Sequence, residues 1–141
     1  MFHVISRQSG KALNIADSSL TSGAEAEQRT AGVGSDSDNW RIQYVAGTGY
    51  VRLIAEHSQH ALAVKGNSKD NGASIVQLSQ STSGFSLDWC LMDISEGYYK
   101  IMNRRSELLV SVDGGFLDDG TDIVQWPDVG NPNEEWKLEP V

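Results

Sequence analysis

The chain contains a single cysteine, Cys90, among its 141 residues. This excludes an internal disulfide framework and favours either a reducing compartment or an oxidising one in which the hydrophobic core suffices. No apolar run approaches the ~20 residues that a membrane span requires, so we expect no membrane insertion. The N-terminus lacks the basic start and apolar stretch of a secretory signal. We therefore expect a protein that is cytoplasmic or is released without a signal peptide.

Basic residues are also few. There are 11 Lys and Arg against 19 Asp and Glu, which gives a formal net charge of −8. Binding to nucleic acid would bring this negative charge against phosphate, so nucleic acid is not expected as a partner, and anionic membrane surfaces are disfavoured for the same reason. Hydrophobic residues make up 39% of the chain. That fraction is enough for the core of one domain and argues against disorder.

A threefold internal repeat is the strongest pattern that the chain does contain. It divides the sequence into blocks of approximately 1–47, 48–95 and 96–141, which we expect to form one domain. Each block has a glycine, a glutamine five residues later and a closing tryptophan, and the tryptophans are 49 and 47 residues apart. These markers are Gly23, Gly72 and Gly120; Gln28, Gln77 and Gln125; and Trp40, Trp89 and Trp136.

Each block consists of short stretches of alternating apolar and polar residues separated by turn residues. This pattern predicts about four strands in each block and about twelve in all. Residues 24–29 are compatible with a helical turn, but no window keeps a 3.6-residue apolar stripe for three turns. The absence of strand–helix alternation predicts an all-β fold.

The third block carries two segments that resemble a known family. The run from Asp119 to Trp126, DGTDIVQW, is similar to the Gly-x-x-Val-x-Gln-Trp segment of ricin-B-type (R-type) lectins, and Asn133-Glu134-Glu135-Trp136 is similar to their closing Asn-Gln-x-Trp. The resemblance covers essentially the whole chain. It implies a β-trefoil, with three blocks around a pseudo-threefold axis, and a lectin that binds glycans or glycoconjugates without catalysis and without a cofactor.

The trefoil also has a physical justification. A block of about 47 residues cannot bury its own apolar face, whereas three blocks closing on one another can, and closure removes open sheet edges. We expect Trp40, Trp89 and Trp136 to be equivalent core side chains, each burying on the order of 150–250 Å². These three tryptophans are therefore assigned to packing and not to sugar binding.

In R-type lectins each block offers one sugar pocket, made from an aspartate, an aromatic side chain after the glutamine, and polar residues before the closing tryptophan. In the third block the resemblance places Ser111 at the aspartate position, Trp126 as the stacking face, and Asn133 and Glu134 as the polar residues. Asp113 lies two residues after Ser111, so on a strand it would point to the same side and replace the missing carboxylate. The family implies a galactose or N-acetylgalactosamine type of sugar.

A second and weaker site is implied in the first block by Asn14 at the aspartate position, Arg29 in place of the aromatic, and Asp38 near the closing tryptophan. The second block has Ala63 and Leu78 at the corresponding positions and keeps neither the polar anchor nor the stacking face. One working site, or two, is therefore expected.

Structural explanations compete with these assignments. Trp126 would alternatively pack under the loop 128–132, and Asp113 and Asp119 would alternatively serve turn formation beside glycine. His57 and His60 are spaced as metal ligands can be, but no carboxylate or cysteine cluster completes a set, so we expect a turn there and no metal.

Two further functions stay open. A trefoil protease inhibitor would act through the exposed loop 128–132. A carbohydrate-binding module of a glycosidase or toxin would belong to a longer chain, an interpretation that Met1 argues against. A single sugar site binds weakly by itself, so useful avidity would come from a homo-oligomer or from attachment to a larger protein.

Overall fold

A computed structural model describes residues 1–33 and 36–141. Its twelve strands confirm the all-β prediction, and five short 3-10 turns accompany them. The strands are β1 Phe2–Ser6, β2 Ala12–Ile15, β3 Ala26–Arg29, β4 Trp40–Tyr44, β5 Val51–Ala55, β6 Ala61–Val64, β7 Ile75–Leu78, β8 Trp89–Ser95, β9 Tyr98–Asn103, β10 Leu109–Val112, β11 Ile123–Trp126 and β12 Trp136–Pro140. The 3-10 turns are η1 Ala16–Ser18, η2 Asp36–Asp38, η3 Lys65–Asn67, η4 Asp113–Gly115 and η5 Pro132–Glu134.

The helical turn considered for residues 24–29 is wrong, because this segment contains strand β3. Its backbone pairs with β2 in an antiparallel register from Ala12↔Arg29 to Ile15↔Ala26. Tertiary pairing therefore overrides a weak local helical preference.

Within the described ranges, no helix is long and apolar enough to cross a membrane.

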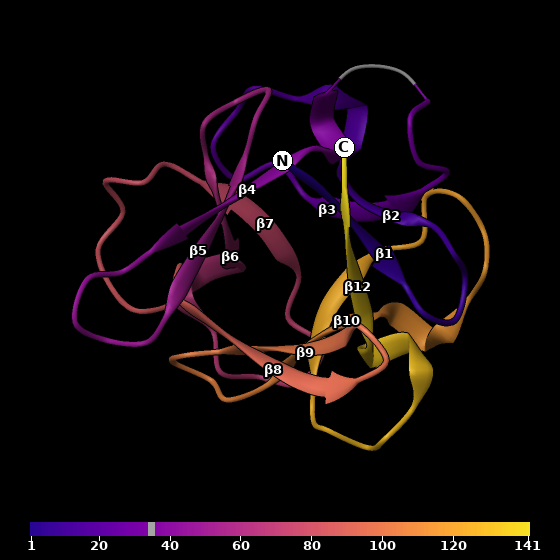
Figure 1. Cartoon of the computed structure of the whole chain (residues 1–141). Coiled ribbons are helices and arrows are strands. Elements are labelled where there is room, and N and C mark those ends of the chain that lie inside the picture. The colour runs from indigo at the N-terminus through magenta and orange to yellow at the C-terminus, as the bar shows by residue number, and fades with distance from the viewer. Residues whose placement is uncertain (34–35) are drawn as a thin grey trace.

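The first and last strands of each block close into a six-stranded barrel. Around the ring, β1 pairs with β4, β4 with β5, β5 with β8, β8 with β9, β9 with β12, and β12 with β1, every pair being antiparallel. The two chain ends therefore lie side by side (Figure 1), where the Val141 amide donates to the Met1 carbonyl. Closure leaves no free edge within this ring.

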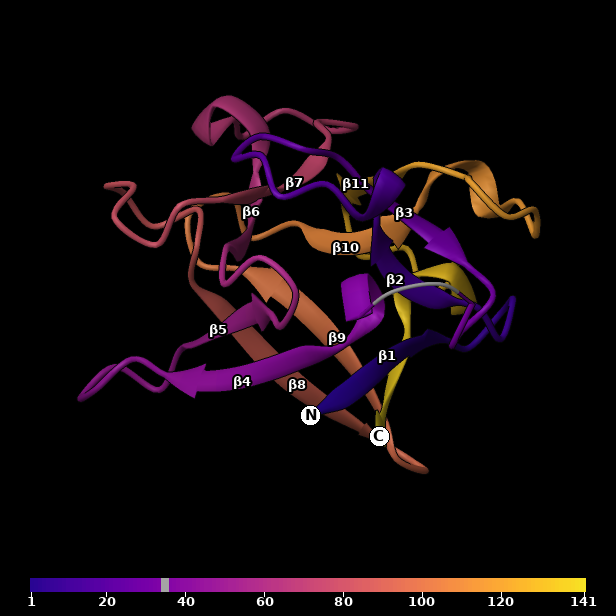
Figure 2. The same cartoon turned by 90° about the horizontal axis from the view of Figure 1, so that it is seen from above.

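The two middle strands of each block form hairpins, β2–β3, β6–β7 and β10–β11. Figure 2 shows these hairpins on one side of the molecule and the chain termini on the opposite side. Isolated bridges join the hairpins in a ring, Glu25↔Val76, Ser74↔Val124 and Glu27↔Asp122. A six-stranded barrel covered by three hairpins is the β-trefoil that the sequence predicts.

The closing tryptophans Trp40, Trp89 and Trp136 are core residues, as predicted. All three have no exposed surface, and each indole Nε1 donates a hydrogen bond of 2.9 Å to a carbonyl of the second strand of its own block. A buried indole needs such an acceptor because its N–H is otherwise unsatisfied. The tryptophan therefore ties the fourth strand of each block to its hairpin.

The repeated glutamines join neighbouring blocks. In each block the glutamine Oε1 accepts a hydrogen bond from a serine of the first hairpin turn at 2.7–2.8 Å. The glutamine Nε2 donates to two carbonyls of the adjacent block. Thus Gln28 binds the third block at Phe116 and Asp118, Gln77 binds the first block at Ser19 and Thr21, and Gln125 binds the second block at Ser68 and Asp70.

The backbone of the repeated glycine completes each of these junctions. Gly23, Gly72 and Gly120 have φ angles of +99°, +84° and +88°, which side chains rarely adopt. Their amides donate to the carbonyls of Gln77, Gln125 and Gln28, respectively. Glycine, glutamine and tryptophan recur because each block must close onto the next in the same way.

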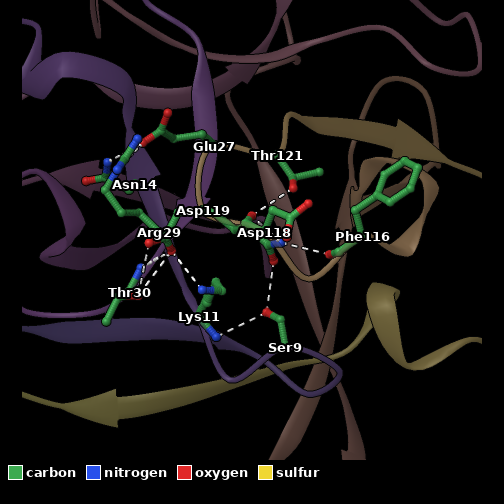
Figure 3. Close-up of polar contacts among 11 residues, drawn as sticks. Ser9, Lys11, Asn14, Glu27, Arg29, Thr30, Phe116, Asp118, Asp119 and Thr121 are labelled. Atoms are coloured by element: carbon green, nitrogen blue, oxygen red, sulfur yellow. Dashed lines mark hydrogen bonds and ion pairs between the residues drawn. The ribbon is translucent and has the colours of Figure 1, made fainter.

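An ionic contact reinforces the junction between the first and third blocks (Figure 3). The Asp119 carboxylate accepts 2.8 Å hydrogen bonds from Lys11 Nζ and from the Thr30 amide. These hydrogen bonds lower the pKa of Asp119 to about 2, with that from Lys11 contributing most. Asp119 therefore serves the junction between blocks, a different structural role from the turn formation beside glycine that was considered for it.

We predict that Gln77→Leu lowers the free energy of unfolding by about 3 kcal/mol. The buried amide makes three side-chain hydrogen bonds, and a typical hydrogen bond contributes a net ~0.5–1.5 kcal/mol. Urea denaturation followed by tryptophan fluorescence measures the change. Gln80→Leu is the matched control, because Gln80 makes one bond, to the Gln59 carbonyl, and we expect a loss below about 0.5 kcal/mol. Equal losses in the two variants would contradict the role given to Gln77.

A second prediction concerns acid stability. A carboxyl whose pKa is lower in the folded state stabilises the fold above its unfolded value of 3.8, and this contribution disappears as the pH falls through about 2. Asp119→Asn should therefore reduce the slope of unfolding free energy against pH between about pH 4 and pH 2. Denaturation at a series of pH values tests this. Asp93→Asn, on strand β8, serves as the control, and a slope unchanged in Asp119→Asn would refute the assignment.

Candidate functional site

A cavity of about 530 Å³ lies in the third block, where β10, η4, β11 and the loop before η5 meet. Of the five residues predicted for a sugar site, four line this cavity: Ser111, Asp113, Trp126 and Asn133. The volume falls in the range of about 300–1,000 Å³ that is common for small-molecule sites. The third block thus brings most of the predicted residues together in one concave site.

Trp126 is the aromatic wall of this cavity. It is the last residue of β11, and its side chain is 43% exposed, whereas the preceding Gln125 is fully buried. Successive strand residues face opposite sides, so the inward glutamine directs the tryptophan outward. A Cβ placed on Gly72 would lie 3.8 Å from the Trp126 ring, so this glycine of the second block supports one part of the indole.

Ser111 and Asn133 supply polar groups to the wall and are themselves held by the protein. The buried Ser111 hydroxyl donates to the Leu109 carbonyl at 3.1 Å. The half-buried Asn133 donates from Nδ2 to the Val112 carbonyl at 2.9 Å. Among the described residues, the Asn133 Oδ1 atom has no hydrogen-bond donor, so it can accept one from a ligand.

Asp113 reaches the cavity by a different route from the predicted one. Strand β10 ends at Val112, and Asp113 begins turn η4, so strand alternation does not place it beside Ser111. The turn brings both residues to the same cavity. Asp113 is exposed, and its carboxylate forms no hydrogen bond within residues 1–33 and 36–141.

Glu134 is fully buried and lies behind the cavity wall. Its Oε1 atom accepts a 2.9 Å hydrogen bond from the Val129 amide, in the loop that forms one side of the cavity. Burial raises the pKa of Glu134. The neighbouring Asp128 is held by Lys100, whose Nζ donates to an Asp128 carboxylate oxygen at 2.9 Å, and this hydrogen bond lowers the pKa of Asp128. Glu134 therefore supports the loop from within.

The three residues of the weaker site in the first block each bond to other groups of the same block instead. Asn14 is buried and donates from Nδ2 to Glu27 at 3.0 Å, while Arg29 donates from Nε to the same Glu27 oxygen at 2.6 Å (Figure 3). Asp38 is also buried and accepts from the Gly32 amide at 2.9 Å. None of Asn14, Arg29 and Asp38 lines the cavity of the third block.

In the second block the equivalent positions are apolar. Ala63 and Leu87 are fully buried in a small cluster with Ile54 and Ala61, and Leu78 packs against it. Ala63 stands where the third block has Ser111, Leu78 where it has Trp126, and Leu87 where it has Glu134. Packed side chains therefore occupy the polar positions that the other two blocks retain.

The cavity also includes Gln8, a polar residue from another block that was not predicted from the sequence. Gln8 belongs to the first hairpin turn of the first block and lines the cavity of the third block. The repeat does show that Gln8, His57 and Arg105 are equivalent positions. Each stands seven residues before the last residue of the second strand of its block, which is Ile15, Val64 or Val112. Sequence spacing alone does not show that this turn meets another block.

The remaining chemical candidates behave as structural residues. His57 lies in the turn between β5 and β6, which confirms the expected turn. Across the described part of the chain, no group of three His, Cys, Asp or Glu residues is arranged to hold a metal ion. Cys90 is a free, half-buried thiol on β8.

Comparison with solved structures identifies relatives of the same fold. The designed 3-fold symmetric protein ThreeFoil has a TM-score of 0.93 and 34% identity, with 99% of this chain and 98% of that chain covered. The exo-β-1,3-galactanase 1,3Gal43A from Clostridium thermocellum has a TM-score of 0.93 and 36% identity, but the match spans only 30% of that enzyme and 99% of this chain.

A ricin B-like lectin from Macrolepiota procera, solved with lactose, shows the same fold at lower sequence similarity. Its TM-score is 0.81 at 14% identity, with 99% of this chain and 94% of that chain covered. Curated protein sequences gave no match.

The family comparison agrees with the fold and the repeat. The model of the ricin-type β-trefoil lectin domain-like family matches residues 1–78 and 86–141. Together these segments include every strand of the barrel and its hairpins. The chain therefore belongs to the ricin-type β-trefoil lectin domain-like family.

Proposed function

We propose that the protein is a non-catalytic lectin that binds galactose- or N-acetylgalactosamine-type glycans in the cavity of the third block. The observation that carries this proposal is the partly exposed indole of Trp126 on a cavity that also presents Asp113 and Asn133. A pyranose has one apolar C–H face and a rim of hydroxyls. The cavity pairs an aromatic face with polar groups in the same way.

The chemistry of the wall supports binding of a neutral, hydroxyl-rich ligand. The sugar would stack on Trp126, and its hydroxyls would donate to the Asp113 carboxylate and to Asn133 Oδ1. Hydrogen bonds to an ionised acceptor are about twice as strong as neutral ones. The sugar class is carried over from the family, and the lactose bound by the Macrolepiota procera lectin is consistent with it.

The placement of the carboxylates supports the absence of catalysis in this proposal. A glycosidase needs two carboxyl groups flanking the scissile bond. Here Asp113 faces the cavity, whereas Glu134 is buried and accepts a hydrogen bond from Val129. That leaves one carboxylate for ligand contact and assigns the other to the loop.

The protease-inhibitor alternative depends on the loop 128–132 acting by itself. Val129, Asn131 and Pro132 of this loop line the same cavity as Trp126, and Lys100 and Glu134 anchor the loop. This arrangement favours a loop that shapes a pocket over a loop that enters a protease. The inhibitor function would be favoured if the protein bound no sugar and if cutting the loop abolished inhibition of a protease.

The galactanase comparison favours a second candidate, a glycan-directing module within a larger protein. The chain is similar to 30% of that enzyme at 36% identity. Binding would then bring a separate catalytic domain to its polysaccharide. A longer open reading frame around this segment would establish this, and the sugar site would be the same.

We predict that Trp126→Ala weakens glycan binding at least about tenfold, the equivalent of ~1.4 kcal/mol, because it removes the stacking face. A glycan array with the purified protein, followed by calorimetry on the best ligand, measures the loss. Tyr44→Ala is the control, since Tyr44 is an 81% exposed aromatic on β4 outside the cavity. Undiminished binding by Trp126→Ala would exclude this site.

The support of the loop by Glu134 can be tested separately. Glu134→Gln keeps an acceptor for the Val129 amide, whereas Glu134→Ala removes it. We expect the Val129 amide to exchange with solvent at least about tenfold faster in the alanine variant and near the wild-type rate in the glutamine variant. Nuclear magnetic resonance measures both rates, and identical exchange in the two variants would contradict the role.

A further inference from the structure

The cavity of the third block is completed by a residue of the first block. Gln8 lies in the turn between β1 and β2, next to Ser9, whose hydroxyl donates to Gln28. Gln28 in turn donates to the carbonyls of Phe116 and Asp118 in the third block. The junction that closes the trefoil therefore fixes the backbone of Gln8 beside turn η4.

The equivalent side chains at the other two junctions are used to tie the blocks together. His57 Nε2 lies 2.8 Å from the Ser19 carbonyl, and Arg105 donates from Nε to the Asn67 carbonyl at 2.8 Å. Gln8 makes no such bond: within the described residues its side-chain amide has no hydrogen-bond partner. This amide is exposed and lines the cavity.

Turn η4 also differs from its two counterparts, at Gly115. The equivalent residues Ser18 and Asn67 carry side chains, and the Ser18 hydroxyl lies 3.1 Å from that of Ser37. At Gly115 a Cβ would lie 3.2 Å from Gln8 Oε1 and 3.8 Å from Asn133 Nδ2. A side chain there would crowd the space between these two amides, and glycine keeps it open.

We propose that Gln8 and Gly115 form a second subsite, which binds the second sugar of a glycan whose first sugar stacks on Trp126. This inference rests on the proposed lectin function. The Gln8 amide offers both a donor and an acceptor, as a sugar hydroxyl does. Trp126 and Gln8 line the same 530 Å³ cavity, so this cavity offers polar contacts in addition to the stacking of the first sugar on Trp126.

The test compares galactose with lactose by calorimetry on the full chain. For Gln8→Ala we expect the Kd of lactose to rise about five- to tenfold, in line with the loss of one or two hydrogen bonds, and the Kd of galactose to stay within about twofold. Gly115→Asn, which copies the second block, should produce the same selective loss. Arg105→Ala changes the equivalent turn position at a junction outside the cavity and should bind both sugars as wild type.

The outcomes separate the inference from the proposed function. If wild type binds both sugars and Trp126→Ala loses both, but Gln8→Ala binds lactose like wild type, the second subsite is refuted and the lectin proposal stands. Equal weakening of galactose and lactose by Gln8→Ala also refutes it, because Gln8 would then contact the first sugar. If wild type binds neither sugar, the galactose part of the proposed function fails, and the subsite fails with it.

Discussion

The three buried glutamines, Gln28, Gln77 and Gln125, are the constraint on which the rest of the structure depends. Each amide is satisfied from two sides, by a serine of its own block and by two carbonyls of the adjacent block. A block cannot shift without leaving buried polar groups unpaired, at ~1–3 kcal/mol each. Because the first block binds the third, the second the first and the third the second, the ring of junctions closes.

This symmetric framework carries three chemically different outer surfaces. At the position of Trp126 the first block has Arg29, bound to Glu27, and the second has the packed Leu78. The framework residues recur because they close the barrel, whereas an outward position at the end of β3, β7 or β11 can change without opening a junction. In the first block the polar groups pair internally, in the second apolar side chains fill the space, and in the third a cavity stays open.

Much of the candidate site was predictable because the repeat places it in register. Once Gln125 is inward, Trp126 must be outward, and this follows from strand alternation alone. Alternation failed for Asp113, because β10 ends one residue before it. It also gave no guide to Glu134, which lies in turn η5 and is buried against the loop. The helical turn considered for residues 24–29 failed because strand pairing, a non-local contact, determines that segment.

The sequence by itself determined the all-β class, the threefold repeat, the core tryptophans and the aromatic of the third block. These features repeat at a fixed spacing, so each block provides evidence for the others. Only the tertiary structure decided which side chains meet between blocks, such as Gln8 at the cavity and Lys11 with Asp119, 108 residues apart. The physical reason is that these contacts depend on how a turn is oriented across a junction. Neither local propensity nor repeat spacing encodes that orientation.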